Sequence, residues 1–224
     1  MGFPDVEKGP DAETGLNMLI LGPQRLVLFE VPKTGSLALR AMVTPHLTDL
    51  LPEAPRHTRA RPFLRDHARA LAQALGGPVE TVAVVRDPLR RMQSWYRYRL
   101  RDEVRDNRIS TREMSFEHFM LDYLTPKPPA HANVGRQDRF VGWDGKAALV
   151  DHLFDYRRLD LLVAFLSDRV GVRLKLPWKN VSPEVEGVGF DLSDDVMAQY
   201  LALNSAEFDL SAAVRQAGHL RHAV

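Results

Sequence analysis

Two apolar runs, each closed by turn residues and followed by a helical pattern, are the clearest features of the hydrophobic pattern. RLVLFEV over 25–31 is mostly apolar, which predicts a buried strand, and the segment from 36 to about 46 continues at helical spacing. TVAVV over 81–85 is apolar on both faces, as expected for a central strand of a parallel sheet. Pro88 then opens a long helix whose apolar residues recur every three or four positions, at Leu89, Met92, Tyr96 and Leu100.

The rest of the pattern predicts further helices, one more strand and two loops. We expect helices over 63–75, 115–124, 158–171 and 192–204, and a strand over 148–156. Prolines within 45–62 predict a connecting loop, and the polar segment 125–137 predicts an exposed one. Strands that alternate with helices predict an α/β domain with a mostly parallel central sheet flanked by helices. In such a sheet, ligands bind at the carboxyl ends of the strands.

Length and composition place limits on the class of protein. The 224 residues suffice for one domain, expected over 18–224 behind a polar, flexible N-terminal arm at 1–17. No apolar run reaches about 18 residues, so no membrane span is predicted, and the polar start lacks the apolar stretch of a signal peptide. The absence of cysteine excludes disulfides, thiolate catalysis and cysteine metal sites. It also fits a reducing compartment, and we expect a cytoplasmic location.

Charge is unevenly distributed along a chain whose net charge is only +1. Residues 56–108 contain thirteen Arg, no Lys and six acidic residues, whereas 181–210 contain seven acidic residues and no Lys or Arg. A basic block in a nearly neutral chain favours a local anion site over a surface that binds nucleic acid. Arginine in place of lysine favours forked contacts to phosphate-like oxygens, although solvated arginines on a protein surface give the same composition.

The segment VPKTGS, over 31–36, lies between the first predicted strand and the first predicted helix. A glycine turn at this point directs backbone N–H groups and the positive end of the helix dipole toward one spot, and Lys33 adds a full charge. Lys33 precedes Gly35, and the second glycine of a Walker A loop is missing, so an ordinary magnesium–nucleotide site is not predicted. A plain strand–turn–helix with an exposed lysine has the same local pattern.

A second motif follows the strand over 81–85. Arg86 ends the strand, Asp87 and Pro88 form a turn, and the helix then carries Arg90 and Ser94. The forked donors of Arg86 and the hydroxyl of Ser94 are suited to a second phosphate group. The alternative is that Asp87 merely caps the helix while the arginines face water.

Together, VPKTGS (31–36) and VVRDPLRRMQSWYRYRL (84–100) resemble the two donor-binding motifs of the sulfotransferase superfamily, in order and in separation. The resemblance is closest to its carbohydrate and bacterial branch, covers about 25–182, and has weaker echoes at 56–65, 153–172 and 178–183. It implies a P-loop-like three-layer domain that binds 3′-phosphoadenosine 5′-phosphosulfate (PAPS) and releases adenosine 3′,5′-bisphosphate, with no metal required.

The resemblance also implies roles for single residues. The 5′-phosphosulfate is expected to contact Pro32, Lys33, Thr34, Gly35 and Ser36, and the 3′-phosphate to contact Arg86 and Ser94, with Arg90 as a helper. In the family loop, several small or hydroxyl residues usually follow the glycine, whereas this chain has Leu37 and Ala38 after Ser36. Two hydroxyl contacts to the donor are therefore missing.

Sulfuryl transfer proceeds by in-line displacement, so it needs a group that neutralises the leaving oxygen and a base that takes the acceptor proton. Lys33 is the candidate for the first role. His57 is the candidate base, because a neutral imidazole near pH 7 suits the task, with His67 as second choice and Asp66 and Glu30 as remoter ones.

The leading hypothesis is a PAPS-dependent sulfotransferase acting on a hydroxyl or amine of a saccharide or small metabolite. One alternative is a catalytically weak relative that binds adenosine 3′,5′-bisphosphate or a partner protein, and another is a small-molecule kinase, against which the incomplete Walker loop speaks. The sequence predicts no nucleic-acid partner. It leaves the acceptor and the oligomeric state open.

Overall fold

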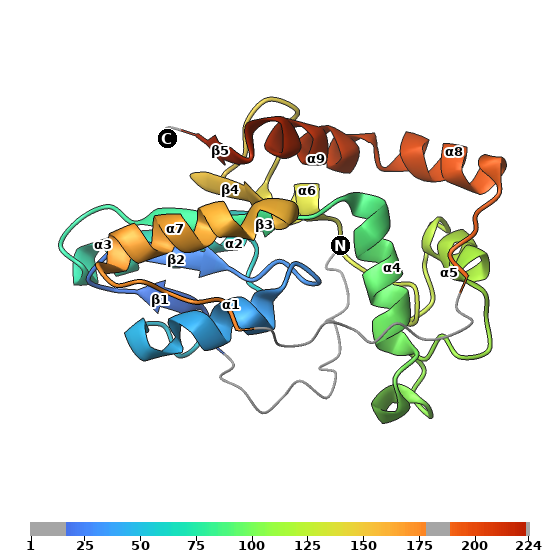
Figure 1. The fold of residues 1–224 in the computed structure, drawn as a ribbon, viewed down its shortest axis with the longest axis horizontal. Helices are drawn as coiled ribbons and strands as arrows, with labels where there is room; N and C mark the ends of the chain where they lie inside the picture. The colour runs from blue at the N-terminus through green and yellow to red at the C-terminus, as the bar shows by residue number, and fades with distance from the viewer. Residues whose placement is uncertain (1–16, 178–188, 223–224) are drawn as a thin grey trace.

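The computed structural model describes residues 17–177 and 189–222, which form a five-stranded sheet with helices on both faces (Figure 1). The strand order is β1 (Leu19–Leu21), β2 (Leu26–Phe29), β3 (Glu80–Val85), β4 (His152–Asp155) and β5 (His219–Arg221). The pairs β2–β3 and β3–β4 are parallel, whereas β1 and β5 run antiparallel to their neighbours. The chain is thus an α/β protein with a mixed sheet. The expected mostly parallel arrangement holds only for the three central strands, because both edge strands reverse direction.

Helices follow the strands in alternation over most of the described chain. They are α1 (Ser36–Val43), α2 (Ala60–Asp66), α3 (Ala68–Ala74), α4 (Pro88–Arg99), α5 (Phe116–Tyr123), α6 (Gln137–Val141), α7 (Leu159–Val170), α8 (Asp194–Leu203) and α9 (Ser205–Ala217), with short 3-10 turns η1 (Thr44–His46), η2 (Asp102–Val104) and η3 (Tyr156–Arg158).

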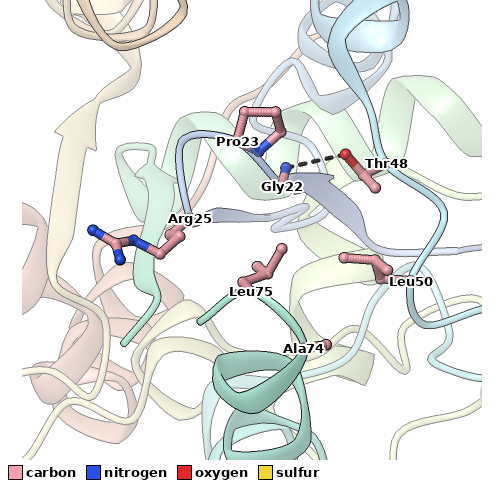
Figure 2. A pocket seen from close by; sticks show the side chains of 7 residues that line it. All are labelled: Gly22, Pro23, Arg25, Thr48, Leu50, Ala74 and Leu75. Atoms are coloured by element: carbon pink, nitrogen blue, oxygen red, sulfur yellow. Dashed lines mark hydrogen bonds between the residues drawn. The ribbon is translucent and has the colours of Figure 1, made fainter. Parts of the chain in front are cut away.

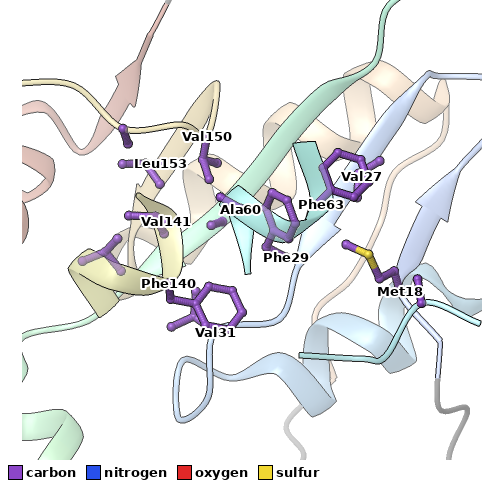
Figure 3. Packing of buried hydrophobic residues seen from close by; sticks show 14 of the residues in the cluster. Met18, Val27, Phe29, Val31, Ala60, Phe63, Phe140, Val141, Val150 and Leu153 are labelled. Atoms are coloured by element: carbon purple, nitrogen blue, oxygen red, sulfur yellow. The ribbon is translucent and has the colours of Figure 1, made fainter. Parts of the chain in front are cut away.

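Alternate residues of the central strands point to opposite faces of the sheet, and each face is buried under helices. Val27 and Phe29 of β2 pack with residues of α2, α3, α6 and α9. Figure 3 shows part of this cluster, with Phe29 beside Phe63. Leu26 and Leu28 point the other way and pack with α1 and α7. This double burial explains why the central strands are continuous apolar runs rather than alternating ones.

A third apolar cluster lies beside the sheet, where α4, α5 and α8 come together (Figure 1). Its largest fully buried side chains include Phe116, Phe119 and Tyr200. Met92 and Tyr96, which the helical spacing placed on one stripe of α4, both belong to it. The stripe therefore anchors α4, which begins shortly after the end of β3.

The helix expected over 63–75 is two helices, because the chain leaves helical geometry at His67, where φ is −125° and ψ is −33°. The segment 125–137 is not simply an exposed loop, since Ala132 and Gln137 have no exposed surface. The sequence pattern also leaves β1, α6, α9 and β5 unpredicted. Strands β1 and β5 have only three residues each, and β5, α6 and α9 have partners that lie far away in the chain.

Some expectations fall outside the part of the chain that is described. These are the N-terminal arm, apart from Asn17, and the echo at 178–183. Asn17 itself forms a β-bridge with Pro55, and its carbonyl accepts a hydrogen bond of 2.7 Å from Arg40 Nη2. Within 17–177 and 189–222, no helix is both long and apolar enough to cross a bilayer.

Candidate functional site

The turn between β2 and α1 has the geometry of an anion-binding loop. Lys33 and Gly35 adopt positive φ values of 69° and 80°, and Gly35 is the N-cap of α1. No side chain caps this helix, so the N–H groups of its first turn remain available to a ligand. The Thr34 hydroxyl donates a 2.7 Å hydrogen bond to the Val31 carbonyl and is buried, so it closes the turn. The Thr34 hydroxyl, which was predicted to contact the phosphosulfate, therefore already donates its proton within the protein.

The Lys33 side chain extends to helix α4. Its Nζ lies 3.1 Å from the centre of the Tyr98 ring and 4.6 Å from the centre of the Trp95 ring. Aromatic faces attract cations, and this contact holds the ammonium beside the helix that carries Ser94. The loop after β2 and the helix after β3 therefore meet through Lys33.

Arg86 makes a second contact between the two motifs. Its Nη1 donates a 3.0 Å hydrogen bond to the carbonyl oxygen of Lys33, 53 residues away in the chain. The guanidinium carbon lies 4.5 Å from the centre of the Tyr156 ring. Burial lowers the pKa of Arg86 below its ordinary value, which reflects the cost of keeping this cation out of water.

Three neighbouring strand ends contribute to this region. The Lys33 loop follows β2, Arg86 follows β3, and Tyr156 follows β4. A Cβ atom on Gly35 would lie 3.3 Å from the Tyr156 ring, so the loop passes close to that ring. The carboxyl edge of the parallel strands thus gathers an amide-rich loop, a lysine and an arginine, a combination suited to an anion.

The remaining residues of the second motif lie on α4. Asp87 caps the helix by accepting a 3.0 Å hydrogen bond from the Arg90 N–H group. Ser94 is 7% exposed, one turn beyond Arg90. The Arg90 side chain is exposed and donates to Gln93 Oε1 at 3.2 Å. Asp87 therefore caps the helix, as the alternative interpretation of this motif predicted. The Arg86 side chain, however, points to the Lys33 loop and not to water.

His57 lies next to the end of β2. Its Nδ1 is 2.8 Å from the carbonyl oxygen of Glu30. A carbonyl only accepts hydrogen bonds, so Nδ1 carries the proton, and the neutral ring presents Nε2 as an acceptor. His57 is exposed as a residue, but the partial burial of its ring lowers its pKa below the ordinary value of 6.5. His57 is therefore neutral at pH 7 with a basic nitrogen available.

Glu30, two residues before Pro32, connects the His57 segment to the loop. It is 3% exposed and pairs with Arg40 and with Arg56, whose Nη2 lies 2.9 Å from Glu30 Oε1. Arg56 Nη2 also donates to Ser36 Oγ at 3.3 Å. Since the Ser36 oxygen accepts this bond, its own proton can point to a ligand.

His67, the second candidate base, lies elsewhere. It occupies the break between α2 and α3, where its ring packs 6.4 Å from the ring of Phe63 and its Nδ1 is 4.0 Å from Glu53. His67 therefore contacts Phe63 of α2 and the segment before that helix, whereas His57 contacts the backbone of Glu30.

Two residues of this region were missed in the sequence. Tyr156 follows directly after β4, so the rule that ligands bind at strand ends is a signal that identifies it. Gln137 is fully buried and binds both backbone polar groups of Arg86, at 2.9 and 2.7 Å. No local pattern distinguishes Gln137 from the polar residues around it.

An open hollow lies at the opposite end of the parallel strands from the Lys33 loop (Figure 2). It is lined by Gly22, Pro23, Arg25, Thr48, Leu50, Ala74 and Leu75. These residues flank the amino end of β2, whereas Lys33 follows its carboxyl end. The hollow is therefore separate from the candidate anion site, and its lining offers only the exposed Arg25 as a charged group.

In the part of the chain that the structure describes, no three His, Asp or Glu side chains gather closely enough to hold a metal ion. The chemistry available at the strand ends is that of backbone amides, hydroxyls, a lysine, arginines and a neutral histidine. Comparisons of this chain with models of known protein families, with curated proteins and with solved structures found no match.

Proposed function

We propose that this chain is a sulfotransferase that moves a sulfuryl group from PAPS to a hydroxyl or amine of a saccharide or small metabolite. The observation that carries the proposal is the 3.0 Å hydrogen bond from Arg86 Nη1 to the Lys33 carbonyl. This bond joins the two motifs that resemble the 5′-phosphosulfate loop and the 3′-phosphate motif of sulfotransferases. A P-loop-like three-layer organisation belongs to the same proposal, and the helices on both faces of the sheet support it.

In this proposal the donor spans the two strand ends. The 5′-phosphosulfate is held by Lys33, by Ser36 and by the first-turn N–H groups of α1, whose positive end favours an anion. The 3′-phosphate is held by Arg86 and Ser94. Arg90 would join them only after its side chain leaves Gln93, with which it now forms a hydrogen bond.

The reaction proposed is an in-line displacement at sulfur. The acceptor oxygen or nitrogen forms a bond to sulfur while the bond between sulfur and the bridging phosphate oxygen breaks, and the bisphosphate leaves with that electron pair. Lys33 neutralises the charge that grows on the bridging oxygen. His57 Nε2 takes the acceptor proton, and its lowered pKa keeps it unprotonated at pH 7.

A binding protein that turns over slowly is the second candidate. It is favoured by the absence of hydroxyls at Leu37 and Ala38, and by the Lys33 ammonium lying 3.1 Å from the centre of the Tyr98 ring. Reaching the bridging oxygen would require this ammonium to leave a favourable contact, at a cost of about 1 kcal/mol or more.

Ligand binding tests the donor assignment. Calorimetry with adenosine 3′,5′-bisphosphate, adenosine 5′-monophosphate and magnesium ATP should show the tightest binding for the bisphosphate. Arg86→Ala should weaken bisphosphate binding by at least about tenfold. Arg25→Ala is the matched control, because Arg25 is an exposed arginine at the amino end of β2, away from the Lys33 loop. Equal affinity for the bisphosphate and monophosphate would overturn the proposal, and preference for magnesium ATP would favour a kinase.

Turnover separates the enzyme from the slow binder. With PAPS and a panel of hydroxyl and amine acceptors, the wild type should release adenosine 3′,5′-bisphosphate. Lys33→Ala should lower kcat by about a hundredfold or more. Bisphosphate binding without turnover on any acceptor would favour the second candidate.

A further inference from the structure

The side chain of Gln137 completes the hydrogen bonding of Arg86 beyond the end of β3. Gln137 Oε1 accepts from the Arg86 N–H group at 2.9 Å, and Gln137 Nε2 donates to the Arg86 carbonyl at 2.7 Å. A backbone N–H group only donates and a carbonyl only accepts, so the orientation of the amide is unambiguous. The last ladder pair of β3 with β4 is Val85 with Asp155, so the amide acts in place of a strand partner for the next residue.

Gln137 is itself held in place by buried charges. The backbone N–H group of Gln137 donates to Glu207 Oε1 of α9 at 3.0 Å, and the same oxygen lies 2.9 Å from Arg91 Nη2 of α4. Arg91 Nη2 also donates to the Gly135 carbonyl at 2.8 Å. Arg91, Gln137 and Glu207 are 1%, 0% and 0% exposed. The start of α6 is thus hydrogen-bonded to both α4 and α9.

The direction of the Arg86 side chain depends on its backbone, which this amide fixes. From that backbone the guanidinium reaches the Lys33 carbonyl on one side and lies over the Tyr156 ring on another. Without the amide, two partly buried polar backbone groups would lose their partners, and rotation of the Arg86 backbone toward water would relieve that cost. Such a rotation would carry the guanidinium away from the Lys33 loop.

We propose that Gln137 is a positioning residue that fixes Arg86 for recognition of the 3′-phosphate, so that the discrimination between adenosine 3′,5′-bisphosphate and adenosine 5′-monophosphate depends on it. The inference rests on the proposed function, because it assigns the 3′-phosphate to Arg86. It goes beyond that function by naming a residue that touches no ligand atom and that determines ligand preference through another residue.

The first test uses Gln137→Met, which has a similar length but cannot form either hydrogen bond. We measure dissociation constants for both nucleotides by calorimetry. Gln137→Met should weaken bisphosphate binding by at least about tenfold and leave monophosphate binding within about twofold, so that the preference is lost. Thr81→Val is the matched control: Thr81 is also buried and hydrogen-bonded on β3, but at the far end of the strand. It should lower the melting temperature and leave the preference unchanged.

A second variant keeps the test decisive if Gln137→Met does not fold. In Gln137→Glu, an ionised carboxylate accepts from the Arg86 N–H group but faces the Arg86 carbonyl without a proton. A protonated one donates as glutamine does. The charged groups in the hydrogen-bond network of this position are Glu207 of α9, Arg91 of α4 and Arg86 itself. Burial beside Glu207 should raise the pKa of the new carboxyl. The preference should therefore be weak at pH 8 and recover toward pH 5.5, with the wild type measured at each pH.

The possible outcomes are distinct. If the wild type shows no preference for the bisphosphate, the proposed function fails and the inference fails with it. If the wild type prefers the bisphosphate and a folded Gln137→Met retains that preference, only the inference is overturned. Where Gln137→Met does not fold, the inference is overturned if Gln137→Glu keeps the preference at pH 8 or lacks it at every pH. Loss in Gln137→Met, or loss with recovery at low pH in Gln137→Glu, supports it, because a purely structural role for Gln137 would not follow the protonation of residue 137.

Discussion

Exchanging Glu207 for glutamine would remove one buried charge while leaving the shape of the side chain almost unchanged. Glu207 and Arg91 are 0% and 1% exposed, and their closest nitrogen and oxygen atoms are 2.9 Å apart. Removing one member of a buried pair leaves the other charge uncompensated, which costs about 3–5 kcal/mol of unfolding free energy. Glutamine still offers an oxygen to Arg91 and to the Gln137 N–H group. We therefore expect Glu207→Gln to lose about 3 kcal/mol, the lower end of that range.

Urea denaturation at pH 7, followed through the fluorescence of the three tryptophans, measures this loss. Asp160→Asn is the control for a charge change at the surface, because Asp160 pairs with Arg158 in solvent, and it should leave the urea midpoint unchanged within experimental scatter. The double variant Arg91→Met/Glu207→Gln should be more stable than Glu207→Gln alone, since it removes the uncompensated cation. A loss below about 1 kcal/mol in Glu207→Gln would refute the interpretation that Arg91 depends on Glu207 as its buried counter-ion.

Further predictions concern the loop and the histidines. Gly35→Ala should lower the unfolding free energy by about 1–2 kcal/mol and weaken bisphosphate binding, because φ is 80° there and a Cβ would press on the Tyr156 ring; calorimetry that finds neither change would contradict this. Burial lowers the pKa of His219 below 6.5, so the unfolded chain binds its proton more readily, and the unfolding free energy should fall as the pH decreases below 6.5. His219→Gln should flatten that slope below pH 6.5, and an unchanged slope would exclude this cause. Under the proposed function, kcat should fall to half its maximum only below pH 6.5, because the pKa of His57 is also lowered. His57→Gln should lower kcat by about a hundredfold or more and remove the pH dependence, and a wild-type profile whose midpoint lies between pH 8 and 7 would exclude His57 as the base.

The central strands could be predicted from the sequence because burial on both faces demands continuous apolar runs, as in TVAVV over 81–85. The edge strands β1 and β5 could not, since each is three residues long and is defined by its partner strand rather than by its own pattern. In the same way, Lys33 and Arg86 follow strand ends and could be identified as candidates. Gln137 acts through bonds to a residue 51 positions away, which no local pattern records.

The fold divides four of the thirteen arginines of the basic block 56–108 into two kinds, which the sequence alone leaves mixed. Seven others are exposed, namely Arg59, Arg61, Arg65, Arg69, Arg90, Arg105 and Arg108. Arg56 and Arg91 are matched by the buried carboxylates of Glu30 and Glu207. Arg86 and Arg99 instead donate to backbone carbonyls and lie against aromatic rings.

Burial lowers the pKa of Arg86, and that of Arg99 to about 10, so each cation is kept from water at a cost. An anionic ligand at the end of β3 would offset that cost for Arg86, whereas Arg56 and Arg91 already have their counter-ions. The block is therefore of mixed character, and Arg86, the arginine proposed to bind the donor, contacts a backbone carbonyl and an aromatic ring instead of pairing with a buried carboxylate.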